Sequence, residues 1–235
     1  MTLNTAIIGG TSGIGLETAL YLKKYGYSVV IGGRSKNKEI IDIPYKFIDV
    51  TIEDSIKEFF FSFPMDTLDS LVFSAGITTP KKSIEDFNVA QYQRVHDVNL
   101  LGAILTLKYA YPLLKKAKGK VVLVNSMAAR TYSKFSGFEY TVTKAALSGL
   151  AKQLAIEWAK DNILINSLFP SMVKTPMLEK NVTKETMDPI ENEIPLKRIA
   201  RPEEISSMIE YLISPKNTYM TGSGIDINGG QFLTG

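Results

Sequence analysis

The sequence contains no cysteine and only one histidine, His96, among its 235 residues. Without cysteine the chain can form neither a disulfide nor a thiolate nucleophile or thiolate metal site, and this composition is typical of a reducing compartment. One histidine is too few for a zinc site built from histidine and cysteine, so we expect no metal centre. The composition favours a cytoplasmic protein whose chemistry uses neither thiols nor a bound metal.

Long apolar runs and a strong charge imbalance are also absent. No run approaches the roughly 18 apolar residues of a membrane span, and strand-like sequence from Leu3 leaves no room for a signal peptide. The 27 basic and 24 acidic residues give a net charge of only +3, which argues against a nucleic-acid footprint. We therefore expect a soluble protein with neither a membrane nor a nucleic-acid partner.

Strand-like runs rich in β-branched residues alternate with segments of helical periodicity between residues 5 and 227. This alternation is typical of an α/β fold with a doubly wound parallel sheet, and the length suits a single domain, residues 1–235. Only about ten residues separate Arg34 from the third run near Tyr45, so we expect a short helix there or none. Residues 177–201 read as irregular and contain Pro189 and Pro195, so we expect a substrate lid over residues 175–201.

A glycine-rich turn follows the first strand-like run and opens a helix that extends to about Tyr25. Glycines let the backbone approach a pyrophosphate, and the N–H groups at the start of a helix hold the anion. The alternative is a tight entry to the helix that binds nothing. We expect the turn to bind a dinucleotide through Gly9, Thr11, Ser12, Gly13, Ile14 and Gly15.

The second strand-like run ends in Gly33, Arg34 and Ser35. In dinucleotide folds an acid near this point binds the adenosine ribose, whereas an arginine accommodates a 2′-phosphate. Because the acid is missing and Arg34 can pair with a phosphate, we expect NADP(H), bound by Arg34 and Ser35, in preference to NAD(H). The alternative for Arg34 is a solvated loop charge.

Residues after the third and fourth runs are further candidates for nucleotide contacts. Asp49, which precedes Val50, is either a partner of the adenine amino group or the N-cap of the next helix. The small residues Ser74, Ala75 and Gly76 predict a tight turn against which a ribose can lie.

A long helical pattern from Ile84 to about Lys118 is expected to break or bend. Asn99 lies in its most apolar part, and a buried amide needs partners, so Asn99 is either a satisfied structural residue or part of a polar relay. Basic residues at the end of the pattern predict a solvated face or, as the less favoured alternative, a docking site for an acidic carrier. These residues are Lys115, Lys116, Lys118 and Lys120.

A buried strand pattern leads to Ser126, and Tyr140 opens a long helix in which Lys144 lies one turn further on. Residues four apart project from the same face of a helix. We therefore expect the phenol, the ammonium and the serine hydroxyl to meet around a space the size of a carbonyl group. Tyr111 and Lys115 have the same spacing but follow no such serine, so we treat them as a decoy.

Together these motifs resemble those of the short-chain dehydrogenase/reductase family over almost the whole chain. The residues that carry the resemblance are Gly9, Gly13, Gly15, Asp49, Val50, Ser74, Ala75, Gly76, Asn99, Ser126, Tyr140, Lys144, Pro170, Thr175, Asn228, Gly229 and Gly230. The resemblance implies a seven-stranded, three-layered Rossmann-like sheet and a nicotinamide cofactor. It also implies cofactor contacts from Asn99, Tyr140, Lys144, Pro170, Val173 and Thr175.

The same resemblance implies a catalytic tetrad. Lys144 would bind the cofactor ribose and, with the positive nicotinamide, lower the pKa of the Tyr140 phenol. Ser126 would hold the substrate oxygen as charge develops on it, and Asn99 would position a water for proton supply. The segment between Ser126 and Tyr140 is one residue longer than is common in the family, which predicts an insertion in the pocket wall.

The expected function is that of an NAD(P)(H)-dependent oxidoreductase, specifically an NADPH-dependent carbonyl reductase that is reversible as an alcohol dehydrogenase. A 3-oxoacyl thioester is the leading substrate, with sugar and steroid carbonyls as alternatives, and a homotetramer or homodimer is expected from the family. The alternative function is an NADP(H)-binding sensor or scaffold without turnover. The side chains that form an apolar substrate wall, or simply pack loops, are Tyr132, Phe135, Phe138, Met177 and Leu178.

Overall fold

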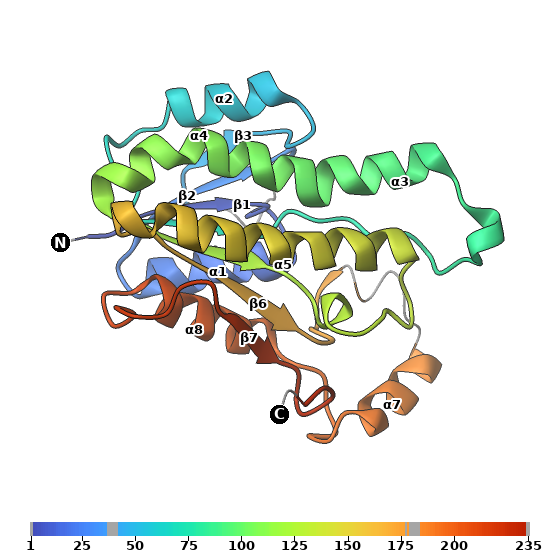
Figure 1. Cartoon of the computed structure of the whole chain (residues 1–235). Coiled ribbons are helices and arrows are strands. Elements are labelled where there is room, and N and C mark those ends of the chain that lie inside the picture. Colours follow the sequence, from blue (N-terminus) through green and yellow to red (C-terminus); the bar gives the residue numbers. More distant parts are fainter. Residues whose placement is uncertain (1, 37–41, 177, 179–183, 234–235) are drawn as a thin grey trace.

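The computed structural model describes residues 2–36, 42–176, 178 and 184–233. Its centre is a seven-stranded parallel sheet with the strand order β3-β2-β1-β4-β5-β6-β7 (Figure 1). The strands are β1 (Asn4–Ile8), β2 (Ser28–Gly33), β3 (Tyr45–Phe47), β4 (Ser70–Phe73), β5 (Lys120–Val124), β6 (Leu164–Pro170) and β7 (Gly224–Ile227). The Rossmann-like, doubly wound α/β fold expected from the sequence is confirmed.

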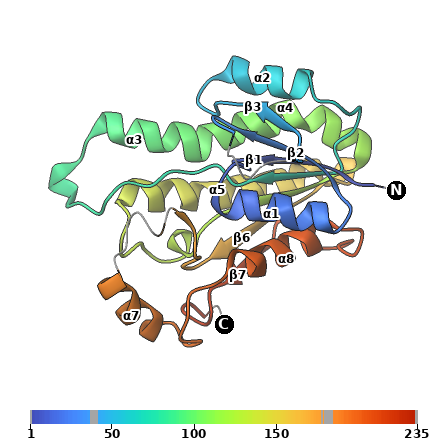
Figure 2. The ribbon, with the colours of Figure 1, turned by 180° about the vertical axis from the view of Figure 1, so that it is seen from behind.

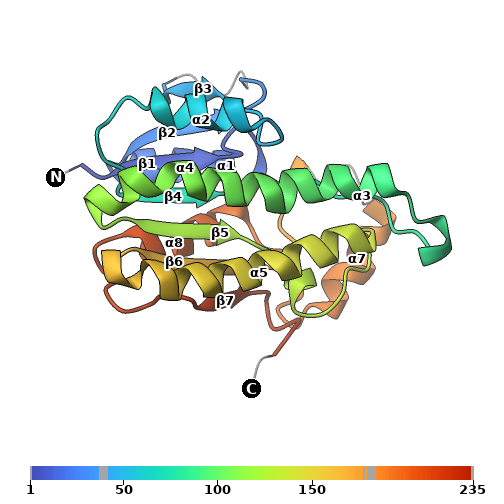
Figure 3. The same cartoon turned by 45° about the horizontal axis from the view of Figure 1, so that its top comes forward.

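Helices cover both faces of this sheet and complete three layers. One face carries α1 (Gly13–Lys24) and α8 (Pro202–Ile213), which lie in front in Figure 2. The other carries α2 (Glu53–Phe61), α4 (Gly102–Ala117) and α5 (Phe138–Trp158), as Figure 3 shows. Among the described helices, none combines the length and the apolar character that crossing a bilayer requires.

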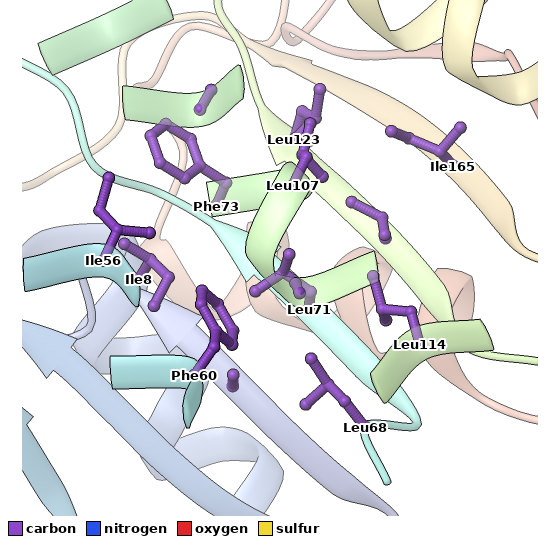
Figure 4. Packing of buried hydrophobic residues seen from close by; sticks show 14 of the residues in the cluster. Ile8, Ile56, Phe60, Leu68, Leu71, Phe73, Leu107, Leu114, Leu123 and Ile165 are labelled. Carbon is purple, nitrogen blue, oxygen red and sulfur yellow. The ribbon is translucent and has the colours of Figure 1, made fainter. Parts of the chain in front are cut away.

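Each face of the sheet has its own cluster of buried apolar side chains. In the cluster beneath α2 and α4, Phe60 and Leu107 pack with Leu71 and Phe73 of β4 (Figure 4). Because helices cover β4 on both sides, its apolar residues form a continuous run rather than an alternating one. The two clusters hold the carboxyl ends of the strands at one edge of the sheet.

The long helical pattern from Ile84 is interrupted, as expected. It begins with a 3₁₀ turn (Ile84–Asp86), continues as α3 (Val89–His96), and passes through a π-helical turn (Asp97–Leu101) into α4. Single π turns within helices are frequent at functional sites. Asn99 lies inside this turn, and its side chain is fully buried.

The expectation that residues 177–201 are irregular is wrong for part of this segment. Helix α7 (Lys184–Glu193) contains Pro189 in its interior, although a proline there removes one backbone hydrogen bond. Ile190 and Ile194 lie four residues apart and are 6% and 1% exposed, so tertiary packing compensates for the lost bond. Residues 177 and 179–183 of the expected lid, and 37–41 of the connection before β3, lie outside the described residues.

Candidate functional site

The carboxyl ends of β1 and β4 lie side by side at the point where the strand order reverses. Ligands of open α/β sheets bind at such a switch point. A cavity of about 260 Å³ lies here, which we call the dinucleotide cavity. The expected contact residues that line it are Gly9, Thr11, Ser12, Gly13, Ile14, Arg34, Asp49, Val50, Ser74, Ala75, Gly76, Tyr140, Lys144 and Thr175.

The glycine turn is shaped for close approach of the backbone. Gly9 has a φ angle of +82°, and a Cβ atom there would lie 2.5 Å from the backbone nitrogen of Ala75. A Cβ on Gly15 would lie 2.2 Å from the carbonyl oxygen of Gly9. Gly15 therefore lets α1 start directly beneath the turn, and it does not itself line the cavity. This open cradle at a helix N-terminus fits the pyrophosphate of a dinucleotide.

The structure does not bring every expected contact residue to this cavity. Ser35 is exposed beyond it, Asn99 is buried behind it, and Pro170 and Val173 line a neighbouring cavity instead.

The expected tight turn after β4 is wrong. Residues 74–79 form no regular turn. The backbone nitrogen of Ser74 instead donates a hydrogen bond to the carbonyl oxygen of Ile8 at 2.8 Å, which continues the pairing of β4 with β1 by one residue beyond the end of the strand.

Arg34 directly follows β2 and is exposed at the border of the dinucleotide cavity, beside Asp49. Burial raises the pKa of the Asp49 carboxyl, but hydrogen bonds from Thr51 and the charge of Arg34 outweigh burial, so the pKa is lowered. Ile52, rather than Asp49, occupies the N-cap position of α2. Asp49 instead accepts bonds from the backbone nitrogen and hydroxyl of Thr51, at 2.9 and 2.7 Å.

Ser126, Tyr140 and Lys144 come together at the end of β5. A second cavity, of about 430 Å³, is lined by Ser126 and Tyr140, and we call it the substrate cavity. Tyr140 lines both cavities and therefore stands at their junction. The Lys144 Nζ atom donates a hydrogen bond to the Val124 carbonyl oxygen at 2.8 Å and lies 5.8 Å from the centre of the Tyr140 ring.

Burial dominates the ionisation of both helix residues. It raises the pKa of the Tyr140 phenol, and a hydrogen bond with Ser126 opposes this only in part. Burial also lowers the pKa of the Lys144 ammonium to about 8. In the chain by itself the phenol pKa is thus raised, whereas the sequence-based expectation was a lowered value with Lys144 and a positive nicotinamide acting together.

Asn99 joins three parts of the site. Its Oδ1 atom accepts from the backbone nitrogen of Ile77 at 2.8 Å, and its Nδ2 atom donates to the Ile77 oxygen at 2.9 Å and to the Thr143 hydroxyl at 3.2 Å. These bonds match the structural alternative for Asn99. A Cβ on Gly76 would lie 3.6 Å from both Asn99 Oδ1 and Lys144 Nζ, so the amide also borders the space around the ammonium.

Two buried polar residues of the site were missed by the sequence analysis. Asn125 accepts a hydrogen bond from the backbone nitrogen of Ser126 and donates to the Ser148 hydroxyl, both at 3.0 Å. Glu139 accepts from the Thr79 hydroxyl at 3.2 Å. Both are 3% exposed. The available signal was the placement of each polar side chain directly before an expected catalytic residue.

The substrate cavity contains part of the expected apolar wall. Tyr132, Phe135 and Leu178 line it, whereas Phe138 does not and packs against Phe87 with a ring-centre distance of 5.7 Å. Met177 lies outside the described residues. The longer segment between Ser126 and Tyr140 thus contributes directly to this wall.

The lysine cluster lies at the other end of the sheet, because Lys120 begins β5 whereas Ser126 follows its end. Lys120 donates a hydrogen bond to the Ser214 oxygen, and Lys115 forms an ion pair of 2.9 Å with Asp161. The cluster and the substrate cavity thus lie toward opposite ends of β5. The Tyr111 hydroxyl also donates a hydrogen bond to Asp161, at 2.6 Å. Tyr111 and Lys115, which have the same spacing as Tyr140 and Lys144, therefore both bond Asp161 and line neither cavity.

Comparison with known proteins agrees with this geometry. A family model described as enoyl-(acyl carrier protein) reductase matches residues 9–231. A tropinone reductase homologue of Arabidopsis thaliana is 31% identical over 250 residues, covering 98% of this chain and 93% of the relative. This chain belongs to the short-chain dehydrogenase/reductase family. It is therefore an oxidoreductase by family, with a nucleotide-binding Rossmann fold.

Two solved structures of the family are similar over almost their whole length. The structure of ElxO with NADP bound has a TM-score of 0.91 and 28% identity, covering 98% of this chain and 99% of that one. The 3-ketoacyl-(acyl-carrier-protein) reductase of Brucella melitensis, complexed with NADH, has a TM-score of 0.88 and 26% identity, covering 98% of each chain. Family neighbours thus bind either nicotinamide dinucleotide.

The burial of the Lys144 ammonium predicts how the stability of the fold changes with pH. The pKa of Lys144 is about 8 in the folded chain and about 10.4 in the unfolded chain. Between about pH 8 and about pH 10.4 the unfolded chain therefore keeps a proton on Lys144 that the folded chain has lost. As the pH rises from 7 to 10.5, the free energy of unfolding of the wild type should therefore increase by about 3 kcal/mol relative to that of Lys144→Met. Urea unfolding of both proteins across this range measures the difference, and parallel stability curves would contradict the assigned burial cost.

Proposed function

We propose that this chain is an NADPH-dependent reductase of ketones or aldehydes that also oxidises the corresponding alcohols. The observation that carries the proposal is the position of Tyr140 at the junction of the two cavities, next to Ser126 and Lys144. In this proposal the whole chain acts as one cofactor-binding domain, and residues 175–201 serve as the lid of the substrate cavity.

Each of these residues has a defined task in the proposed reaction. When NADPH is bound it supplies the hydride. The Tyr140 hydroxyl gives its proton to the carbonyl oxygen, and the Ser126 hydroxyl holds that oxygen as negative charge develops. The Lys144 cation binds the cofactor ribose and stabilises the phenolate that Tyr140 leaves behind. Asn99 holds the second turn of α5 through Thr143 and borders the route of proton supply to Lys144.

The preference for NADP(H) rests on the end of β2. Gly33 and Arg34 border the dinucleotide cavity, and no acid directly follows that strand. A guanidinium at this position pairs with a 2′-phosphate, which NAD(H) lacks. The NADP bound in ElxO is consistent with this assignment, whereas the NADH in the Brucella reductase shows that the family permits the other cofactor.

A 3-oxoacyl thioester is the first substrate to test, since the Brucella relative is a 3-ketoacyl reductase. Sugar and steroid ketones complete the panel. We further propose that the protein works in the cytoplasm as a homodimer or homotetramer. NADPH oxidation against this panel tests the proposal, because NADPH binding without turnover of any carbonyl would instead identify a sensor or scaffold.

Removing the proton donor should abolish most of the activity. Tyr140→Phe keeps the ring and loses the hydroxyl, so kcat should fall about 100- to 10,000-fold, as expected for the loss of a general acid, with little change in NADPH affinity. Steady-state kinetics and a fluorescence titration measure the two quantities. The matched control is Tyr111→Phe, which should leave kcat unchanged, and full turnover by Tyr140→Phe would show that another residue donates the proton.

Removing the guanidinium should separate the two cofactors. Arg34→Ala should raise the Kd for NADPH about 10- to 100-fold, the range expected for a lost charge-assisted hydrogen bond, and leave the Kd for NADH nearly unchanged. Calorimetric titration of the variant and the wild type with each cofactor provides the comparison. Equal losses for NADPH and NADH would count against the phosphate role.

A further inference from the structure

Gln231 has a buried polar atom that nothing in the described chain satisfies. The residue lines the substrate cavity together with Ser126 and Tyr140. Its Oε1 atom is buried and has no hydrogen-bond partner among the described residues. Buried side-chain polar atoms usually have a partner, and one without a partner is destabilising. Because this oxygen has almost no accessible surface, a ligand would reach it only after the Gln231 side chain rotates, and binding the amide would then remove that penalty.

The backbone that carries Gln231 is tightly held. Its nitrogen donates to the Asn228 oxygen at 3.0 Å, and the Asn228 side chain bonds the Gly230 nitrogen at 2.9 Å and the Phe232 oxygen at 2.7 Å. Gly229 and Gly230 have φ angles of +61° and +85°, a region that favours glycine. The Asn-Gly-Gly turn therefore fixes the starting point of the Gln231 side chain.

The segment after α7 holds this turn from the other side. The backbone nitrogen of Leu196 donates to the Gly229 oxygen at 3.2 Å, and a Cβ on Gly230 would lie 3.1 Å from Pro195. Because the turn is fixed by its own bonds and by its neighbour, only the side-chain torsions of Gln231 remain to adjust. A binding group placed in this way loses little entropy when it meets a ligand.

Several other polar groups of the cavity are already engaged. Lys134 and Glu193 form an ion pair with each other, and the Ser133 hydroxyl accepts a hydrogen bond from the Ser136 nitrogen at 2.9 Å. No further charged side chain is among the described residues that line the cavity. The opposite charges of Lys134 and Glu193 cancel, so the described part of the lining favours an uncharged ligand.

We propose that Gln231 is a specificity-determining residue that binds a hydroxyl group of an uncharged carbonyl substrate. The inference rests on the proposed reductase function and adds the chemical class of the substrate. A hydroxyl both donates and accepts, so it can bind the Gln231 amide in either of its two orientations. An analogue without the hydroxyl would leave the amide unpaired and is selected against for that reason.

Matched ketones test this inference. The pairs are cyclohexanone with 4-hydroxycyclohexanone and butanone with 4-hydroxy-2-butanone. The wild type should favour the hydroxylated member of at least one pair by about tenfold in kcat/KM, the value of one hydrogen bond. Gln231→Met has similar length but no hydrogen-bonding group, so it should bring the ratio close to one, mainly by lowering the kcat/KM of the hydroxylated ketone. Gln93→Met, at an exposed position on α3, is the matched control and should preserve the preference.

The outcomes separate this inference from the proposed function. Reduction of plain and hydroxylated ketones with equal kcat/KM by the wild type would overturn the role of Gln231 alone. The same conclusion would follow if 4-oxocyclohexanecarboxylate were the preferred substrate, because the cavity would then select a charge. Failure of the wild type to reduce any ketone would overturn the reductase proposal and this inference together.

A stability measurement gives an independent readout. Since Oε1 has no partner to lose, Gln231→Met should melt at the same temperature as the wild type or higher. A melting temperature lower by several degrees would show that the amide supports the fold, and would overturn its assignment as a free substrate ligand. This result does not depend on which ketone is tested.

Discussion

The burial of the Lys144 ammonium is the constraint on which the site depends. A buried cation is costly unless it is paired, and Lys144 is 4% exposed with the Val124 oxygen as its hydrogen-bond acceptor. That acceptor is available because β5 ends at Val124, at the carboxyl edge of the sheet. The ammonium lies beside the Tyr140 ring, so a negative charge on the phenol would offset part of the burial cost. Burial nevertheless raises the pKa of the phenol in the chain by itself, so the Tyr140 hydroxyl keeps its proton there.

The sheet brings the other parts of the site to this cation. The reversal of strand order between β1 and β4 opens the space in which the Gly9 turn meets the loop after β4. Asn99 holds that loop through Ile77 and the second turn of α5 through Thr143, so the π turn that carries Asn99 connects the loop with the helix of Tyr140. Asn125, directly after β5, and Glu139 in α5 make comparable links. These bonds fix the positions of the side chains that are proposed to react.

Much of this arrangement could be predicted from short-range patterns. The alternation of strands and helices, the glycine turn, and the spacing of Tyr140 and Lys144 depend on local sequence, and parallel strands place their carboxyl ends at one edge. Features that depend on distant contacts were missed or wrong. Helix α7 is supported by the burial of Ile190 within it and of Ile194 directly after it, and Ser74 after β4 pairs with Ile8 of β1 instead of entering a turn. The sequence does not indicate a role for Gln231, because only the folded structure shows that it lines the substrate cavity and has an unpartnered oxygen.

The central claim is that hydride reaches the carbonyl carbon from the nicotinamide while Tyr140 protonates the oxygen. Reduction of a ketone with NADPH deuterated at C4 of the nicotinamide, followed by mass spectrometry of the alcohol, tests it most directly. The account predicts one deuterium on the carbinol carbon, transferred from only one of the two C4 positions. Loss of the label to solvent, or uptake of deuterium at the carbinol carbon itself from heavy water with unlabelled NADPH, would contradict the account.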